Sequence, residues 1–196
     1  MPRKDCSIVQ LGPVSERGDH DFYSTDYKAT AHLFAVLKKH RIILPHTIIE
    51  PSVGKGHIAK VCKVLGHDVI CYDVVDRGYP GTILQDWETV QRPALDHMAI
   101  IMNPPYSRAL EHLSHAIDML HDGEYCCALL RLQFLETRKR KIFFEKYPMR
   151  YVAVFSFRIL CAKNDEEEAR QVHSAIAFAW YIWQKGFVGN PELLWI

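Results

Sequence analysis

The sequence lacks an excess of charge of either sign. Among its 196 residues, 24 Lys and Arg face 23 Asp and Glu, and the formal net charge is +1. This balance argues against a uniformly basic coat for nucleic acid and against an acidic solvating tail, although it leaves local patches open. The apolar fraction of 48% is that of a globular protein. The length suits one domain of ordinary size.

The sequence also lacks CxxC pairs among its six cysteines and any apolar run near the roughly 20 residues that a membrane helix needs. Its first residues, Met-Pro-Arg-Lys-Asp, contain no apolar stretch of a signal peptide. We therefore expect buried, reduced thiols in a cytoplasmic protein that has no membrane partner. The eleven histidines form neither an HExxH motif nor a Cys/His zinc spacing, so we expect no metal site.

Apolar and β-branched runs alternate with segments of helical periodicity along most of the chain. Several of the runs are apolar throughout, which is typical of a parallel sheet covered by helices on both faces. We predict an α/β fold, a Rossmann-like three-layer sandwich with a mostly parallel seven-stranded sheet, in which the last strand along the chain is antiparallel. The expected strands are 47–50, 69–73, 83–86, 98–102, 125–130, 151–155 and 173–183, although helix is not excluded for the last. The expected helices are 26–40, 58–65, 134–146 and one that begins at Ser107.

A glycine-containing turn follows the first expected strand. The segment from Glu50 through Pro51, Gly54 and Gly56 lies between strand and helix, where glycine lets the backbone approach a ligand closely. The spacing fits neither GxGxxG nor GxxxxGK[ST], and the acid at the strand end would repel a phosphate. An ordinary strand-to-helix turn is the alternative, but the pattern suits a ligand with a cationic end.

Acidic residues also close the next two expected strands. Asp73 stands about 20 residues after the glycine turn, where an open α/β sheet uses a carboxylate to accept from ribose hydroxyls. Asp86 is placed to accept from an adenine amino group, and Trp87 to cover the ring. Each acid alone is more often a solvated loop residue. Three successive strands that end on an acid indicate a nucleoside without phosphates that carries a positive group.

The most specific motif is Asn103-Pro104-Pro105-Tyr106, directly after the fourth expected strand. Two consecutive prolines cannot continue a sheet ladder, so they hold the Asn103 side chain and the Pro104 carbonyl in a fixed geometry. Together these groups present two acceptors to the hydrogens of an NH2 group, while Tyr106 offers a flat face to a planar ring. A rigid strand-ending turn is the alternative interpretation.

These motifs together resemble class I S-adenosylmethionine-dependent methyltransferases, and in particular small phage and prophage DNA N6-adenine methyltransferases. The resemblance covers roughly residues 21–187 and includes the stretches 130–136 and 179–186. It implies S-adenosylmethionine as cofactor, methyl transfer to the adenine N6 amino group, and Asn103, Pro104, Pro105 and Tyr106 as catalytic residues. The cofactor-binding residues that it implies are Phe22, Tyr23, Thr25, Glu50, Pro51, Gly54, Gly56, Asp73, Asp86, Trp87 and Asn103.

A basic segment follows the fifth expected strand. Residues 131–150 carry seven Lys or Arg and two Glu, a local net charge of +5. Such clusters are usually solvated helix faces, but this one comes close to the edge of the sheet where the site is expected. We predict that it binds the phosphate backbone with steep salt dependence. The residues assigned to nucleic acid are Arg131, Arg138, Lys139, Arg140 and Lys141.

Between Tyr106 and the last expected strand, the sequence leaves no room for a separate target-recognition domain, so we expect none. We expect an irregular arm over residues 1–20 and one catalytic domain over 21–196. Specificity is then low, or it comes from short loops, a homodimer or a partner subunit. Three alternatives stay open: an RNA adenine N6-methyltransferase, a protein glutamine methyltransferase, and a non-catalytic cofactor-binding subunit of a methyltransferase complex. The expected setting is the cytoplasm of a prokaryotic or phage-infected cell, with nucleic acid, DNA above all, as the partner.

Overall fold

The computed structural model describes residues 23–159, 161–163 and 176–196, so the predicted arm and Phe22 lie outside the described residues. The strands of the main sheet are β2 (Thr47–Glu50), β3 (Asp68–Asp73), β4 (Thr82–Leu84), β5 (Ala99–Met102), β6 (Tyr125–Arg131), β7 (Tyr151–Val154), β9 (Phe178–Gln184) and β10 (Glu192–Trp195). Their order across the sheet is β10-β7-β9-β6-β5-β2-β3-β4. A separate antiparallel pair joins β1 (Tyr23–Ser24) to β8 (Ala162–Lys163).

The predicted fold is confirmed, with one more strand than expected. Every neighbouring pair in the main sheet is parallel except those of β9, which runs antiparallel between β6 and β7. The added strand is β10, which pairs in parallel with β7 at the edge of the sheet. Its Trp195 is 64% exposed, whereas Trp180 and Trp183 of β9 are buried in the core.

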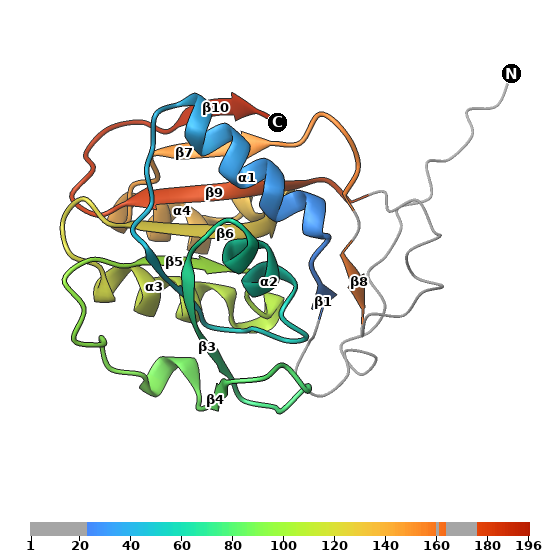
Figure 1. Cartoon of the computed structure of the whole chain (residues 1–196). Coiled ribbons are helices and arrows are strands. Elements are labelled where there is room, and N and C mark those ends of the chain that lie inside the picture. The colour runs from blue at the N-terminus through green and yellow to red at the C-terminus, as the bar shows by residue number, and fades with distance from the viewer. Residues whose placement is uncertain (1–22, 160, 164–175) are drawn as a thin grey trace, which may run out of the picture.

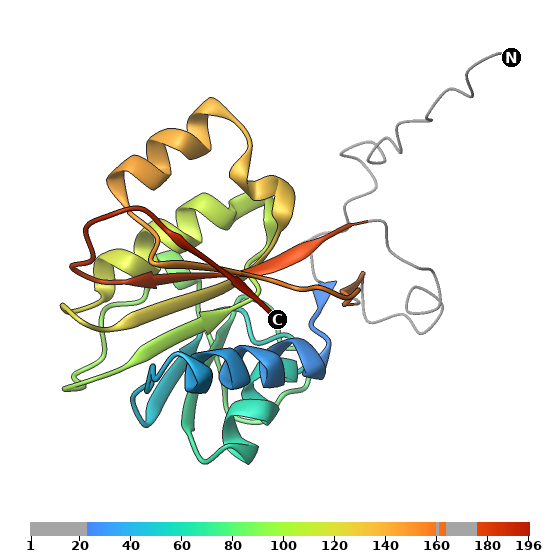
Figure 2. The same cartoon turned by 90° about the horizontal axis from the view of Figure 1, so that it is seen from above.

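Helices cover both faces of the sheet, as Figure 2 shows. Helices α1 (Tyr27–Lys39) and α2 (His57–Val64) lie on one face, and α3 (Ala109–Met119) and α4 (Arg138–Lys146) on the other (Figure 1). Successive residues of a strand point to opposite faces, so a strand buried on both sides has to be apolar throughout. In β5, Ile100 and Met102 join the hydrophobic cluster under α3 and α4, while Ala99 and Ile101 join the cluster under α1 and α2.

Two helices begin later than predicted. The segment Tyr106–Arg108 forms a short 3-10 turn, so α3 starts at Ala109 and Ser107 is not its N-cap. The segment Leu132–Leu135 forms another 3-10 turn, and α4 starts at Arg138. The Thr137 side chain accepts from the backbone N–H of Arg140 at the start of α4. In both places the chain turns tightly after a buried strand before it enters the helix.

The described cysteines carry free thiols, as expected. Cys62, Cys71, Cys126 and Cys127 are buried, and Cys161 is partly exposed. Burial raises the pKa of the Cys71 thiol to about 12, which keeps it protonated near neutral pH. Over the described ranges, no helix combines the length and apolar character needed to cross a bilayer.

Candidate active site at the carboxyl ends of β2 and β5

The two main sequence motifs meet where the strand order reverses direction. β2 and β5 are parallel neighbours, and the chain continues to β3 and β4 on one side and to β6 on the other. In open α/β sheets, ligands bind in the crevice at such a switch point. Glu50 is the last residue of β2, and Asn103 directly follows β5. The glycine turn and the Asn-Pro-Pro-Tyr motif therefore begin at adjacent strand ends.

The side chain of Asn103 is held in one orientation by the segment around β1. Its Nδ2 donates to the carbonyl oxygen of Tyr23 (3.1 Å) and to Oγ1 of Thr25 (3.0 Å). A backbone carbonyl can only accept, so the amide nitrogen must face Tyr23 and the amide oxygen must face away. That Oδ1 atom is buried and has no hydrogen-bond partner among the described residues. The motif thus presents one fixed, unused acceptor.

Tyr106 lies against two other side chains. Its ring centroid is 4.8 Å from that of Tyr23 and 4.5 Å from Cζ of Arg131. The Tyr106 hydroxyl and Nε of Arg131 are both buried without a partner in the described part of the chain. Burial raises the pKa of Tyr106 well above its ordinary value, so the hydroxyl stays protonated. Unpaired buried polar atoms are rare in folded proteins, and here Asn103, Tyr106 and the Arg131 that contacts the Tyr106 ring each carry one.

Glu50 is a buried acid with a free oxygen. The residue is 1% exposed, and its Oε2 has no partner among the described residues. Desolvation raises the pKa of this carboxyl well above its ordinary value, against the opposing effect of the Ala59 N–H at the start of α2. A buried carboxyl that lacks a full set of partners is costly unless a ligand completes it. Pro51, next in the chain, is buried in the turn.

Asp73 ties the glycine turn to the end of β3. Its Oδ2 accepts from the backbone N–H of Gly54 (2.8 Å), and its Oδ1 accepts from the N–H of Val75 (3.0 Å). Each carboxylate oxygen keeps a second lone pair, so a ligand hydroxyl can still bind there. The sequence predicted only a ligand contact for Asp73. The structure adds a role in holding the loop, which depends on a contact between residues 19 apart.

Gly56 is needed for a reason that the sequence did not reveal. A Cβ at this position would lie 2.1 Å from Cδ2 of the Tyr79 ring, and the backbone has a φ of 78°. Tyr79 is buried and belongs to the connection between β3 and β4. A side chain at Gly56 would collide with this ring and strain the backbone. Nothing in the residues next to Tyr79 signals this long-range contact.

Asp86 stands at the same edge of the sheet, but Trp87 does not. Asp86 accepts from the Glu88 N–H (3.1 Å), and its Oδ2 lies 3.4 Å from Nη1 of Arg108. The Trp87 ring is 1% exposed, and its Nε1 donates to the His112 carbonyl in the core. This placement does not support the expectation that Trp87 covers a ligand ring. Arg108, two residues after the Asn-Pro-Pro-Tyr motif, is the neighbour that sequence analysis missed.

The predicted nucleic-acid residues divide into two groups. Arg138, Lys139, Arg140 and Lys141 lie on the first turns of α4, which contain no acidic residue. Lys139 and Lys141 are mostly exposed and pair loosely with Glu111 and Glu145, at 3.7 and 3.5 Å. Arg131, at the end of β6, instead contacts the ring of Tyr106. The structure therefore places Arg131 with the Asn-Pro-Pro-Tyr motif and the other four on the helix beyond it.

No cluster of His, Cys, Asp or Glu side chains within the described ranges could hold a metal ion. The candidate site residues at the carboxyl ends of β2, β3, β4 and β5 instead provide acceptors. They comprise the free oxygens of Glu50 and Asn103, the carboxylates of Asp73 and Asp86, and the carbonyl of Pro104, to which no described residue donates. Such a set suits a ligand with positive charge, hydroxyl groups and amino groups.

The sequence matches no protein-family model and no curated protein, but the fold is similar to that of solved methyltransferases. A proposed class I S-adenosylmethionine-dependent methyltransferase from Listeria monocytogenes is 15% identical, with a TM-score of 0.62 over 90% of this chain and 65% of that one. A proposed RNA methyltransferase from Pyrococcus horikoshii is 18% identical, with a TM-score of 0.59 over 84% of this chain and 87% of that one.

The methyltransferase subunit of a type I restriction-modification system from Streptococcus thermophilus is 12% identical, with a TM-score of 0.61 over 90% of this chain. The match covers 47% of that subunit, so the chain spans about half its length. At these identities the likeness concerns the fold. The chain has the Rossmann-like fold of class I methyltransferases.

Proposed function

We propose that the protein is an S-adenosylmethionine-dependent methyltransferase that modifies the N6 amino group of adenine in DNA. The observation that carries this proposal is the fixed Asn103 amide, whose buried Oδ1 has no partner among the described residues. Methylation of an aromatic amine needs an acceptor at this place, beside a site for the methyl donor. The methyltransferase fold, and neighbours that include a restriction-modification subunit, support the same function.

The residues at the ends of β2 and β3 fit the cofactor. Glu50 provides a buried carboxyl with a free oxygen for the positively charged part of the molecule. Asp73 keeps lone pairs for the ribose hydroxyls, and Asp86 for the adenine amino group. When bound, S-adenosylmethionine supplies a methyl group on a positively charged sulfur, which makes that methyl electrophilic. Tyr23 and Thr25, which the resemblance assigns to cofactor binding, also hold the Asn103 amide.

The chain's own residues would activate and position the amine. The lone pair of an exocyclic amine is delocalised into its ring, which makes the nitrogen a poor nucleophile. Hydrogen bonds from the NH2 group to Oδ1 of Asn103 and to the Pro104 carbonyl favour a tetrahedral nitrogen whose lone pair points at the methyl group. This is positioning combined with electrostatic stabilisation, and it needs no covalent intermediate on the protein.

The base has to reach Tyr106 from outside a double helix. An enzyme that acts on a base within a duplex turns the nucleotide out of the stack, and an aromatic ring commonly receives it. In this structure Cζ of Arg131 lies 4.5 Å from the centroid of the Tyr106 ring, which leaves no space for a base between them. A base that stacks on this face therefore displaces the Arg131 guanidinium.

DNA binding through α4 is expected to depend steeply on salt. Replacing Lys139 and Lys141 together with alanine should flatten the plot of log affinity against log salt by up to about 0.9 for each lysine that contacts a phosphate of duplex DNA. Fluorescence anisotropy with a labelled duplex measures this slope. The matched control replaces Lys38 and Lys39 on α1, across the sheet from α4. Equal slopes for the wild type and the α4 variant would remove this helix from the DNA interface.

Replacing Asp73 with asparagine is expected to weaken cofactor binding about tenfold or more. The N–H groups of Gly54 and Val75 donate to the Asp73 carboxylate, and the substitution deprives both of a charged acceptor. Isothermal titration calorimetry with S-adenosylmethionine measures this change. Asp76→Asn is the matched control, since Asp76 accepts from the Gly78 N–H in the same connection but is exposed. An Asp73→Asn protein with wild-type affinity would contradict the role of Asp73.

The proposed function is tested by transfer of labelled methyl from S-adenosylmethionine to duplex DNA, single-stranded DNA, RNA and a translation release factor in parallel. We expect the label in DNA, as N6-methyladenine after digestion to nucleosides. Label confined to RNA or to a glutamine of the release factor would replace DNA by one of the alternative substrates. Cofactor binding with no transfer to any substrate would instead indicate a non-catalytic subunit.

A further inference from the structure

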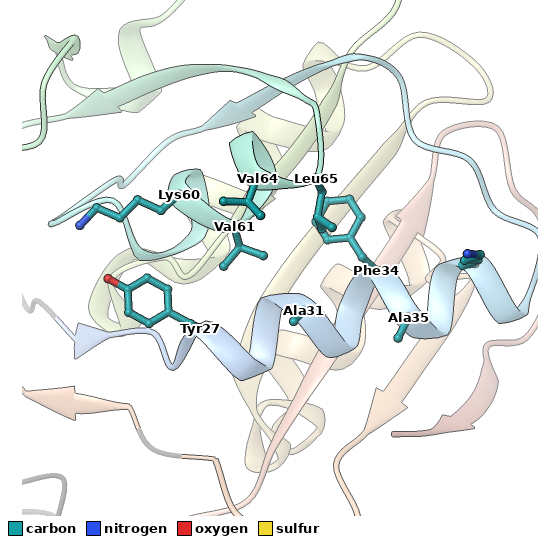
Figure 3. Close-up of a pocket in the computed structure, with 9 residues that line it drawn as sticks. Tyr27, Ala31, Phe34, Ala35, Lys60, Val61, Val64 and Leu65 are labelled. Carbon is teal, nitrogen blue, oxygen red and sulfur yellow. The ribbon is translucent and has the colours of Figure 1, made fainter.

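An apolar groove runs between α1 and α2 on the outer side of these helices (Figure 3). Its volume is about 600 Å³. α1 contributes Tyr27 and Ala31, α2 contributes Val61 and Val64, and Leu65 directly after α2 also lines the groove. Three of these side chains are well exposed, at 44% for Tyr27, 87% for Val64 and 49% for Leu65. The groove is therefore an open surface feature, and no part of the candidate active site lines it.

The groove depends on a second apolar face of α1. The first face, which includes Leu33 and Leu37, is buried against the sheet. The second consists of Tyr27, Ala31 and Ala35, each four residues apart, and therefore runs along one side of the helix. A helix that covers a sheet needs one apolar stripe, and its other side is normally polar. The second stripe has no partner among the described residues beyond α2.

The charged residues within the two helices that form the groove are all basic. α1 and α2 together carry five lysines, and neither helix contains Asp or Glu. Lys60 lies at the end of the groove next to Tyr27 (Figure 3), and Lys38 belongs to the last turn of α1. No carboxylate among the described residues pairs with either ammonium group. Apart from Asp26, which caps the start of α1, the charged residues of this segment and of α2 are thus lysines, in a chain of almost zero net charge.

We propose that this groove binds an amphipathic helix of a partner protein, with apolar side chains in the groove and Asp or Glu beside them. Grooves between helices commonly receive a helix whose anchors recur every three or four residues. α1 has 13 residues and spans about 20 Å, which matches some four turns of such a partner helix. The lysines attract the acidic side chains of such a helix, which orients it, and they repel helices that carry basic residues.

The same charges argue against a second copy of this chain as the occupant. A two-fold interface places one patch against itself, so it would bring Lys38 and Lys60, which line the groove, of one chain against the same two lysines of the other. Like charges held close together across an interface oppose association. An acidic helix both fills the apolar surface and neutralises the lysines.

The test uses two synthetic peptides of about 18 residues, long enough to form a helix in water. Both have the same leucine stripe, flanked by Glu in one and by Lys in the other. We expect the acidic peptide to bind the full-length protein about tenfold more tightly at low salt, with a difference that shrinks as salt rises. Fluorescence anisotropy of the labelled peptides measures both affinities without reference to methyl transfer, so this test is independent of the proposed function.

Variants locate the binding surface. Val64→Asp should weaken binding of the acidic peptide about tenfold or more, because it places a charge in the groove. Val188→Asp is the matched control, since Val188 is 89% exposed and lies far along the chain from α1 and α2. The double variant Lys38→Glu/Lys60→Glu should reverse the preference between the peptides. Lys139→Glu/Lys141→Glu on α4 makes the same change of net charge and should leave it intact.

Three results would overturn the proposal. The first is equal binding of the acidic and basic peptides, and the second is an equal loss of binding in the Val64→Asp and Val188→Asp proteins. The third is a wild-type protein that sediments as a dimer and becomes monomeric on Val64→Asp, since a second copy would then occupy the groove.

Discussion

Replacing Asn103 with alanine should lower methyl transfer at least about 100-fold and leave S-adenosylmethionine affinity within about threefold of the wild type. The change removes the buried Oδ1 that would accept from the substrate amine, an interaction that strengthens as the nitrogen becomes tetrahedral. Single-turnover transfer of labelled methyl to DNA measures the first quantity, and calorimetry the second. A thermal melt establishes that the variant is folded.

Thr25→Val is the control that keeps the Asn103 amide but loosens its orientation, whereas Asn103→Ala removes the amide altogether. It removes one of the two acceptors for Nδ2 of Asn103 and keeps the other, the Tyr23 carbonyl, so Oδ1 stays close to its place. We expect a smaller loss of rate than for Asn103→Ala, about tenfold, because one hydrogen bond to the amide remains. Near-wild-type turnover in the Asn103→Ala protein would contradict the catalytic assignment, whatever the behaviour of Thr25→Val.

Much of the fold was predictable because buried strands in a parallel sheet must be apolar on both faces. Ala99–Met102 is such a run, and its residues alternate between the two hydrophobic clusters. The edge strand Glu192–Trp195 escaped prediction, since it is four residues long and mostly exposed. The late start of α3 also escaped, because Ser107 has the side chain of a helix cap while the two prolines before it lead into a 3-10 turn.

The sequence predicted the candidate site only in so far as its residues stand at the ends of strands. The carboxyl ends of parallel strands lie along the same edge of a sheet. The positions of Glu50, Asp73 and Asn103 at strand ends therefore predicted that they share this edge. Contacts between distant segments were not predictable. The Tyr79 ring over Gly56, the Arg108 guanidinium beside Asp86 and the donation from Asn103 to the Tyr23 carbonyl each join separate parts of the chain. Sequence patterns describe neighbours along the chain, not partners across it.

Two buried acceptors, on adjacent strands, remain without partners in the described structure. One is Oε2 of Glu50, the last residue of β2, and the other is Oδ1 of Asn103, the residue that follows β5. Leaving either atom unpaired inside the protein costs stability, and a folded chain keeps such groups mainly where a ligand completes them. In the proposed function the first atom serves the cofactor and the second the substrate amine. The reacting groups would then meet between neighbouring strand ends.

Glu50→Gln should make the free protein more stable at neutral pH and weaken its binding of S-adenosylmethionine. Burial raises the pKa of Glu50 above its value of 4.5 in the unfolded chain, so the folded state holds its proton more tightly. The contribution of Glu50 to the wild-type free energy of unfolding then falls as pH rises above 4.5, by about 1.4 kcal/mol per pH unit until the folded pKa is reached. Glutamine has no proton to lose and avoids this cost.

The binding defect of Glu50→Gln should be about tenfold or more, because a neutral amide replaces the acceptor for a cationic ligand. Binding of a cation beside Glu50 lowers the pKa of this carboxyl, so the wild-type protein should release a proton on binding in the range above pH 4.5. Calorimetry in two buffers with different ionisation enthalpies measures that release. The variant should show none, and equal proton release from both proteins would assign it to another group.

Glu124→Gln provides the control with the opposite sign. Glu124 is also buried, but Arg92 and the N–H groups of Met98 and His121 outweigh the effect of burial and lower its pKa. Its stabilisation is therefore present above pH 4.5 and is lost as pH falls through the lowered value. In thermal melts from pH 5 to pH 8, the melting temperature of Glu50→Gln should rise relative to that of the wild type as pH increases. The melting temperature of Glu124→Gln should stay below that of the wild type throughout. Parallel behaviour of the two variants would show that Glu50 is paired and ionised in the free protein, and would leave the cofactor site without its unpaired acceptor.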